Sequence, residues 1–476
     1  MPDRPPDAPA EPAPAQRPYF SLWATAVFAV LAAVLVGLFY YTWNSPLESL
    51  REPEASLERL VGRELDFRDA LQRAAAWERR LYDLVGTEPE MLDDAIDRYD
   101  ELSDVSATDT VELDRLILMG EAGRLDGSRD PFGRPAALRP DDERMVEWVR
   151  AAYLGDPPTR AAAAARLKEI RGDLGRDWFS DTLARRIAER AGLTREHAQA
   201  AAAIQRRGHA LLVRVRLLTG ASAGVILLSG LVLWRAARRP SRARVAAAPL
   251  PPSWPAADGW GLFIRSAFGY MALPVGASFL TGKGPLLTLA VMMVAGLPVL
   301  WWTWRCCRAH DLSPLAAFGL RPGPGGAGRV VGLGLALFAL SLAGETVLYL
   351  GLSAAGVTTH WADGFPEDLL WGSPLAVASE TAETVLGAPV FEEIIFRGLL
   401  FPALRLALPL WPAALLSGAL FAGAHGYGVV GFAAVAWSGA IWAVGYERTG
   451  SLLPCMLAHA LGNLMSTVSF VLLLRL

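Results

Sequence analysis

Long apolar runs constrain the fold of this chain more than any other feature. They occupy residues 19–43 and most of residues 211–476, whereas residues 44–209 are rich in charged side chains. A run of about 18 or more apolar residues is long enough to cross the hydrocarbon core of a membrane as a helix. The sequence therefore predicts an all-α fold, with a polytopic membrane helical core and an additional helical extramembrane domain.

The apolar runs divide into nine predicted membrane-spanning segments. Their ranges are 19–43, 217–234, 259–281, 284–304, 329–352, 376–402, 410–427, 429–447 and 452–474, the last seven of which form a multi-span membrane domain over 256–476. The first run is too long for the apolar part of a signal peptide and no convincing cleavage site follows it, so we expect a retained anchor. Residues 1–18 are rich in Pro and Ala, which predicts a disordered tail.

The charged region 44–209 predicts a helical domain outside the membrane. Its apolar residues recur at three- and four-residue spacing, and Pro and Gly separate the segments. The region holds 26 basic and 34 acidic residues, and the chain has no basic stripe of the kind that binds nucleic acid. We find no catalytic pattern in it. A solvated helical domain is the simpler interpretation, and substrate capture or regulation is the alternative.

Arginines after the second predicted span indicate the topology. Five of them begin a basic linker over residues 235–255, namely Arg235, Arg238, Arg239, Arg242 and Arg244. Cytoplasmic loops carry an excess of such residues. We therefore expect a multi-pass protein of the cell (inner) membrane with residues 44–209 on the extracytoplasmic side. A patch for anionic lipid or nucleic acid is a weaker interpretation, because topology alone accounts for the cluster.

Two glutamates and an arginine interrupt the predicted span 376–402. Ionisable groups at membrane depth cost roughly 2.5–3.5 kcal/mol each even on the more lenient scale, so we expect them to face a cavity. On a helix Glu393 and Arg397 are four residues apart and can pair, whereas Glu392 points about 100° away. We expect the pair to fix the helix and Glu392 to act as a general base. A buried ion pair with a spare carboxylate is the purely structural alternative.

Two later spans add further polar side chains. One contains His425, and the last contains His459 with Asn463 one helical turn later. A single histidine on an apolar helix is more often a core residue than a catalyst, but three polar motifs in this order predict a shared chamber. Two histidines and a carboxylate can position a water molecule or bind a metal ion. An asparagine amide can donate a hydrogen bond to a developing oxyanion.

These three motifs, E-E-x-x-x-R, F-x-x-x-H and H-x-x-x-N, resemble those of the CAAX-protease and bacteriocin-processing (Abi) family of intramembrane endopeptidases. Residues 446–452 are also similar to that family. The resemblance implies a protease core at about 330–476 that hydrolyses a peptide bond in a membrane-associated protein or peptide. It also implies that Glu392 and His425 activate water and that His459 and Asn463 stabilise the oxyanion.

The sequence leaves two questions open: whether catalysis needs a metal ion, and whether the protein is an enzyme. The family has been described as metalloprotease and as glutamic protease; if zinc is present, the expected ligands are Glu392, His425 and His459. The chain lacks the H-E-x-x-H spacing, which favours a mechanism without a cofactor. The competing class is a membrane transporter, or a bacteriocin-immunity or scaffold protein that uses the chamber for binding. The paired repeat halves typical of transporters are not visible.

Overall fold

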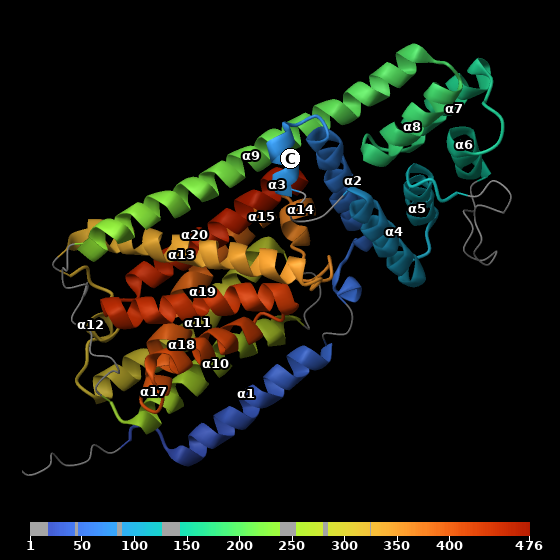
Figure 1. Cartoon of the computed structure of the whole chain (residues 1–476). Helices are drawn as coiled ribbons and strands as arrows, with labels where there is room; N and C mark the ends of the chain where they lie inside the picture. The colour runs from blue at the N-terminus through green and yellow to red at the C-terminus, as the bar shows by residue number, and fades with distance from the viewer. Residues whose placement is uncertain are drawn as a thin grey trace, which may run out of the picture.

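The computed structural model describes residues 18–42, 46–82, 88–125, 143–238, 254–278, 284–323 and 325–476. The described residues form helices and no strand, which confirms the all-α fold class (Figure 1). The predicted disordered tail lies outside them except for its last residue. The basic linker lies outside them over residues 239–253, and with it three of its five arginines.

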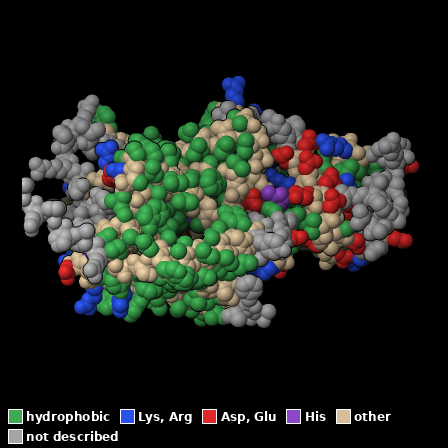
Figure 2. Space-filling view, turned by 90° about the horizontal axis from the view of Figure 1, so that it is seen from below, with side chains coloured by type: hydrophobic (Ala, Val, Ile, Leu, Met, Phe, Trp, Pro, Cys, Tyr) green, Lys and Arg blue, Asp and Glu red, His purple; other side chains and the backbone are tan. Residues whose placement is uncertain are grey.

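The membrane core is a set of long helices that run alongside one another (Figure 1). They are α1 (Leu22–Thr42), the last part of α9 (Thr194–Arg238), α10 (Ala256–Ser278), α11 (Pro285–Ala309), α13 (Gly326–Ala354), α18 (Leu410–Gly423), α19 (Val429–Thr449) and α20 (Leu453–Phe470), with the short α12 (Pro314–Ala317) between α11 and α13. Buried apolar side chains such as Val299, Phe338 and Phe421 join them. Apolar side chains also cover much of the face of this core that Figure 2 shows, as expected of a surface that faces lipid.

Five helices among the described residues are long and apolar enough to cross a membrane. They cover Thr194–Leu231, Pro285–Ala309, Gly326–Ala354, Val429–Thr449 and Leu453–Arg475. The other four predicted spans are shorter, charged or interrupted. The apolar part of α1 and helix α18 are short, and α10 carries the buried Asp258 and Arg265. The chain is thus a multi-pass membrane protein, with fewer regular full-length spans than the sequence predicts.

The predicted span 376–402 is not one regular helix. It is built from α15 (Pro374–Ala382), a π-helical segment Glu383–Gly387, α16 (Ala388–Glu392), a second π-helical segment Glu393–Leu400, and α17 (Phe401–Arg405). Each π-helical segment leads into a proline, Pro389 or Pro402. A proline lacks the N–H group and its ring clashes with the carbonyl group four residues earlier, so the preceding turn widens. Such widened turns are frequent at functional sites.

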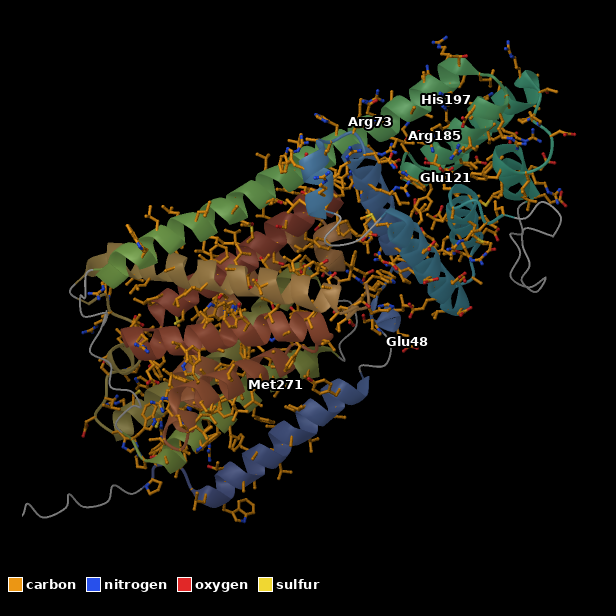
Figure 3. All side chains as sticks on the ribbon, in the orientation of Figure 1. Glu48, Arg73, Glu121, Arg185, His197 and Met271 are labelled. Atoms are coloured by element: carbon orange, nitrogen blue, oxygen red, sulfur yellow. The ribbon has the colours of Figure 1, made fainter. Side chains whose placement is uncertain are left out.

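The region between α1 and the membrane part of α9 folds as a helical domain. Its elements are η1 (Leu47–Ser49), α2 (Pro53–Leu71), α3 (Ala76–Tyr82), α4 (Glu88–Val105), α5 (Asp109–Glu121), α6 (Glu143–Tyr153), α7 (Arg160–Asp173), α8 (Trp178–Arg190) and the start of α9. Its core includes Tyr99, Trp148 and Phe179. Charged side chains gather on its surface (Figure 2). Arg185 donates to the Glu121 carboxylate between α8 and α5, and both side chains are labelled in Figure 3.

Helix α9 joins this domain to the core without a break and runs through residues 209–217, where the sequence predicts the domain to end and the membrane helix to begin. Arg214 and Arg216 lower the local hydropathy there but do not end the helix. Arg214 donates to the carbonyl oxygen of Leu472 at 3.0 Å, and Arg59 of α2 donates to that of Leu474 at 2.7 Å. Helices α2 and α9 are therefore hydrogen bonded to the backbone of Leu472 and Leu474, which follow α20.

Between α13 and α15 the chain packs against the domain. Helix α14 (Glu367–Trp371) begins with a buried glutamate, Glu367, whose carboxylate accepts the backbone N–H groups of Arg51 and Glu52 at 2.8 Å each. His360 lies 3.0 Å from the carboxylate of Glu101 on α4. These contacts place the domain directly over one end of the membrane core.

Candidate active site

The predicted pair of Glu393 and Arg397 forms at the centre of the core. Arg397 Nη1 donates to Glu393 Oε1 at 2.8 Å, and neither side chain has any exposed surface. The same Glu393 oxygen lies 3.0 Å from His459 Nδ1. A carboxylate paired with a guanidinium accepts hydrogen bonds, so Nδ1 of His459 carries a proton. Glu393 therefore holds Arg397 of its own helix and His459 of α20 in fixed orientations.

Aromatic rings enclose this ion pair. The Arg397 guanidinium lies 4.1 Å from the ring centroid of Phe421 and 5.0 Å from that of Trp442, within the range of cation–π attraction. The Trp442 ring in turn stacks on His459, with centroids 4.7 Å apart and planes 25° from parallel. Motif reasoning from the sequence missed Trp442. The F-x-x-x-H motif contains Phe421, but its pattern does not show that this ring covers the arginine.

His425 lies just beyond the end of α18. The predicted span 410–427 places it within a helix instead. Its Nδ1 atom is 2.8 Å from the carbonyl oxygen of Phe421. A carbonyl oxygen only accepts, so Nδ1 is the donor and Nε2 is left to face the site. The imidazole also stacks on Tyr427, with centroids 5.5 Å apart. The short connection between α18 and α19 thus fixes both the orientation and the tautomer of His425.

Glu392 brings the two histidines to one point. Its Oε2 atom lies 3.8 Å from Nε2 of His425 and 3.8 Å from Nε2 of His459. This oxygen is buried and has no hydrogen-bond partner among the described residues. A separation of 3.8 Å is too long for a direct hydrogen bond, but a water molecule about 2.8 Å from each atom would bridge them, donating its two hydrogens to two of the atoms and accepting from an imidazole N–H at the third. The arrangement suits a bound water between a carboxylate and two imidazoles.

Asn463 takes a different partner from the one that its predicted role requires. Its Nδ2 atom donates to the carbonyl oxygen of Thr384 at 2.6 Å. In this π-helical segment the N–H of Ala388 bonds to the carbonyl of Glu383 five residues earlier. The next such donor would be Pro389, which has no N–H. Asn463 therefore supplies the hydrogen bond that the proline removes, and only the second N–H of its amide can donate to a substrate.

Glu345 is a further membrane-depth carboxylate that the sequence motifs did not single out. It lies on α13 and accepts a short hydrogen bond from the hydroxyl of Ser438 on α19. Ser438 directly precedes Gly439, at which an added Cβ atom would lie 2.7 Å from Arg397 Nη2. The signal was present in the sequence as a lone glutamate within the predicted span 329–352.

Few side chains of the site are free to hold a metal ion. No group of three or more His, Cys, Asp or Glu side chains is disposed to hold a metal ion in the part of the chain that the structure describes. Zinc needs ligand atoms about 2.0–2.2 Å away in tetrahedral array. Glu393 is already engaged by Arg397 and His459, which leaves Glu392, His425 and His459 as the widest set available. We derive no chemical step through a metal.

A family of known proteins matches the part of the chain that holds this site. Residues 374–465 match the family described as Rce1-like, type II CAAX prenyl endopeptidase Rce1-like. The matched segment contains Glu392, Glu393, Arg397, His425, His459 and Asn463. Searches of curated proteins and of solved structures returned no match. The match confirms the resemblance inferred from the motifs and supports an intramembrane endopeptidase in general: over residues 374–465 this membrane protein is similar to the Rce1-like CAAX endopeptidase family.

Proposed function

We propose that this protein hydrolyses a peptide bond of a membrane-associated protein or peptide with a water molecule held by Glu392, His425 and His459. One observation carries the proposal. The unpartnered, buried Oε2 atom of Glu392 faces two imidazole nitrogens at 3.8 Å each. A carboxylate near a pair of imidazoles, shielded from bulk water, is suited to remove a proton from water.

In the proposed reaction, the Glu392 carboxylate takes a proton from the water molecule while the water oxygen bonds to the scissile carbonyl carbon. His425, with Nδ1 bonded to Phe421, presents Nε2 to the same water. The negative charge that develops on the carbonyl oxygen is stabilised by the free N–H of Asn463 and by His459, which in this scheme carries a proton on Nε2 as well as the one that Nδ1 donates to Glu393. The carbon–nitrogen bond then breaks, and the proton held by Glu392 passes to the departing amine.

Glu393 and Arg397 act as positioning residues in this scheme. Their ion pair is sealed by Phe421 and Trp442, so it cannot exchange partners with water. The hydrogen bond from His459 to Glu393 directs the other imidazole nitrogen toward Glu392. Loss of either positioning residue should lower the rate constant of cleavage, although the general base Glu392 is still present.

The decisive experiment compares wild type with Glu392→Gln in lipid nanodiscs, using a fluorogenic peptide library that contains membrane-spanning peptides. Glutamine keeps the shape of the side chain but cannot act as a base, and we expect a loss of at least about a hundredfold. Glu380→Gln is the matched control, because Glu380 lies on α15 of the same composite helix. Retained cleavage by Glu392→Gln would exclude the glutamate mechanism. Absence of cleavage by wild type would favour the binding role of a transporter or scaffold.

Metal dependence is tested separately on the same protein. The proposed mechanism predicts that a strong chelator leaves cleavage unchanged, and that added zinc does not increase it. Loss of activity on chelation, restored by zinc, would instead assign Glu392, His425 and His459 as metal ligands.

We further propose that the helical domain lies on the extracytoplasmic side of the cell membrane. The arginines that follow the membrane part of α9 support this topology. The three cysteines of the chain are buried, so one added surface cysteine reports its own accessibility. A membrane-impermeant maleimide should label Ala165→Cys in intact cells. Labelling only after the cells are lysed would place the domain in the cytoplasm.

A further inference from the structure

Helix α3 lies at the level where α9 passes from polar to apolar surface. Glu78 of α3 is buried and accepts hydrogen bonds from Arg216 of α9 at 2.8 and 2.7 Å. The next residue of α9, Leu217, is 68% exposed, and exposed apolar side chains follow it along the helix. These exposed leucines face lipid in a membrane protein, so the Glu78–Arg216 pair fixes α3 at the membrane boundary.

The outer surface of α3 combines large apolar side chains with cations. Trp77 is 70% exposed and Leu81 is 49% exposed. Arg79 and Arg80 are exposed on the same short helix, and Arg73 precedes it at the junction of domain and core (Figure 3). Tryptophan beside arginine is the composition of segments that lie in the headgroup region of a bilayer.

A groove of about 1130 Å³ opens beside α3, between the helical domain and the core. Its domain side includes Phe67, Arg79 and Tyr82. Its core side includes Tyr349 and Val357, which lie at the end of the membrane helix α13 and just after it. One wall is therefore cationic and aromatic, and the opposite wall combines apolar side chains with the hydroxyl-bearing Ser353, Thr358 and Thr359.

The charge of the groove is opposite to that of the domain. Four arginines and two carboxylates line it, although acidic residues exceed basic ones in residues 44–209. Of the arginines, Arg98 pairs with Glu64 and Arg68 pairs with Asp69. Arg79 donates to the carbonyl oxygen of Gln72, and within the described ranges no carboxylate pairs with Arg79 or Arg80. Two cations at the level of the lipid headgroups thus lack a carboxylate partner among the described residues.

We propose that this groove, together with α3, binds an anionic phospholipid. The phosphate lies against Arg79 and Arg80, an acyl chain lies along Tyr349 and Val357, and Trp77 inserts among the neighbouring headgroups. A lipid fits better than a polypeptide because the ends of membrane helices form one wall and the unpaired cations lie at headgroup level. This inference does not depend on peptide hydrolysis.

The binding test uses the full-length protein, stripped of lipid in detergent and titrated with phosphatidylglycerol or phosphatidylcholine under native mass spectrometry. Each arginine near an anionic headgroup contributes about 1 kcal/mol. Arg79→Gln/Arg80→Gln should therefore weaken phosphatidylglycerol binding roughly thirtyfold and leave phosphatidylcholine binding unchanged. The matched control, Lys168→Gln/Arg195→Gln, removes two exposed cations from helices at the far end of the domain and should bind like wild type.

Equal binding by the groove variant and wild type would overturn the proposal. So would a groove variant that binds phosphatidylglycerol normally but no longer binds a membrane-anchored peptide, because the groove would then be a polypeptide site.

A second measurement tests the position of α3 without changing its charge. A polarity-sensitive fluorophore on Trp77→Cys should emit at shorter wavelength in nanodiscs and be quenched by headgroup spin labels. The same fluorophore on Ala165→Cys, on α7 of the domain, should show neither effect. Identical emission and quenching at the two positions would show that α3 does not contact the membrane.

Discussion

The buried pair of Glu393 and Arg397 gives the sharpest energetic prediction. We consider Glu393→Gln, Arg397→Met and the double variant. Each single variant leaves one uncompensated charge in a site with no exposed surface. Removing one partner of a buried ion pair costs about 3–5 kcal/mol, because the remaining charge is neither solvated nor neutralised.

The double variant removes both charges at once. It loses the cation–π contact with Phe421, about 1–2 kcal/mol, and weakens one hydrogen bond to His459, about 1 kcal/mol. The total of roughly 3 kcal/mol is less than the sum of the two single variants, which is at least about 6 kcal/mol. We therefore expect a coupling free energy of about 3 kcal/mol or more between Glu393 and Arg397.

The assay is the unfolding free energy of the four proteins in the same bilayer environment, with cleavage measured in parallel. Stability of the double variant should exceed that expected from adding the single effects. Its cleavage should stay low, because His459 is no longer held by a charged carboxylate. Additive stability losses, or coupling below about 1 kcal/mol, would show that the two side chains do not form a buried charge pair.

Three further predictions concern packing, a hydrogen bond and a pH response. Gly439→Ala should lower stability by about 1–3 kcal/mol in thermal unfolding, because its Cβ atom would lie within 3 Å of the Arg397 guanidinium and of the α18 backbone. In the control Gly462→Ala the added Cβ atom meets nothing within 4 Å, and stability should not change. Asn463→Ala leaves the carbonyl that it caps without its side-chain donor and should cost about 1–3 kcal/mol in the same assay, together with much of the cleavage rate. Burial, with the neighbouring Asp177 carboxylate, raises the pKa of Glu58 from 4.5 to about 7. The native state then binds more protons than the unfolded state between those values, so stability falls as pH rises through this window, and Glu58→Gln should flatten the fall in a pH series of unfolding curves.

Hydropathy was enough to predict the fold class and the approximate positions of the membrane helices. It failed where other forces decide the backbone. The predicted membrane segment begins at residue 217, but α9 runs through this point without a break, and Arg214 and Arg216 just before it bond to Leu472 and Glu78. Pro389 and Pro402 are visible in the sequence, but hydropathy does not register the missing N–H and the ring clash that widen the turns before them.

The site was predictable as a set of residues and less so as a geometry. Spacing alone paired Glu393 with Arg397, because residues four apart on a helix are neighbours. The convergence of His425 and His459 on Glu392 depends on how α18, α20 and the composite helix pack, which no local pattern contains. The bond from Asn463 to Thr384 requires a carbonyl orphaned by a proline 74 residues earlier in the chain than the asparagine.

The central claim is that Glu392, His425 and His459 share one water molecule. An experimental map of the wild-type protein in lipid, at a resolution that shows ordered solvent, tests it most directly. We predict a single solvent peak about 2.8 Å from Glu392 Oε2 and from both Nε2 atoms. A Glu392 side chain turned toward the acyl chains, or a strong peak about 2.0–2.2 Å from all three groups as for zinc, would contradict it.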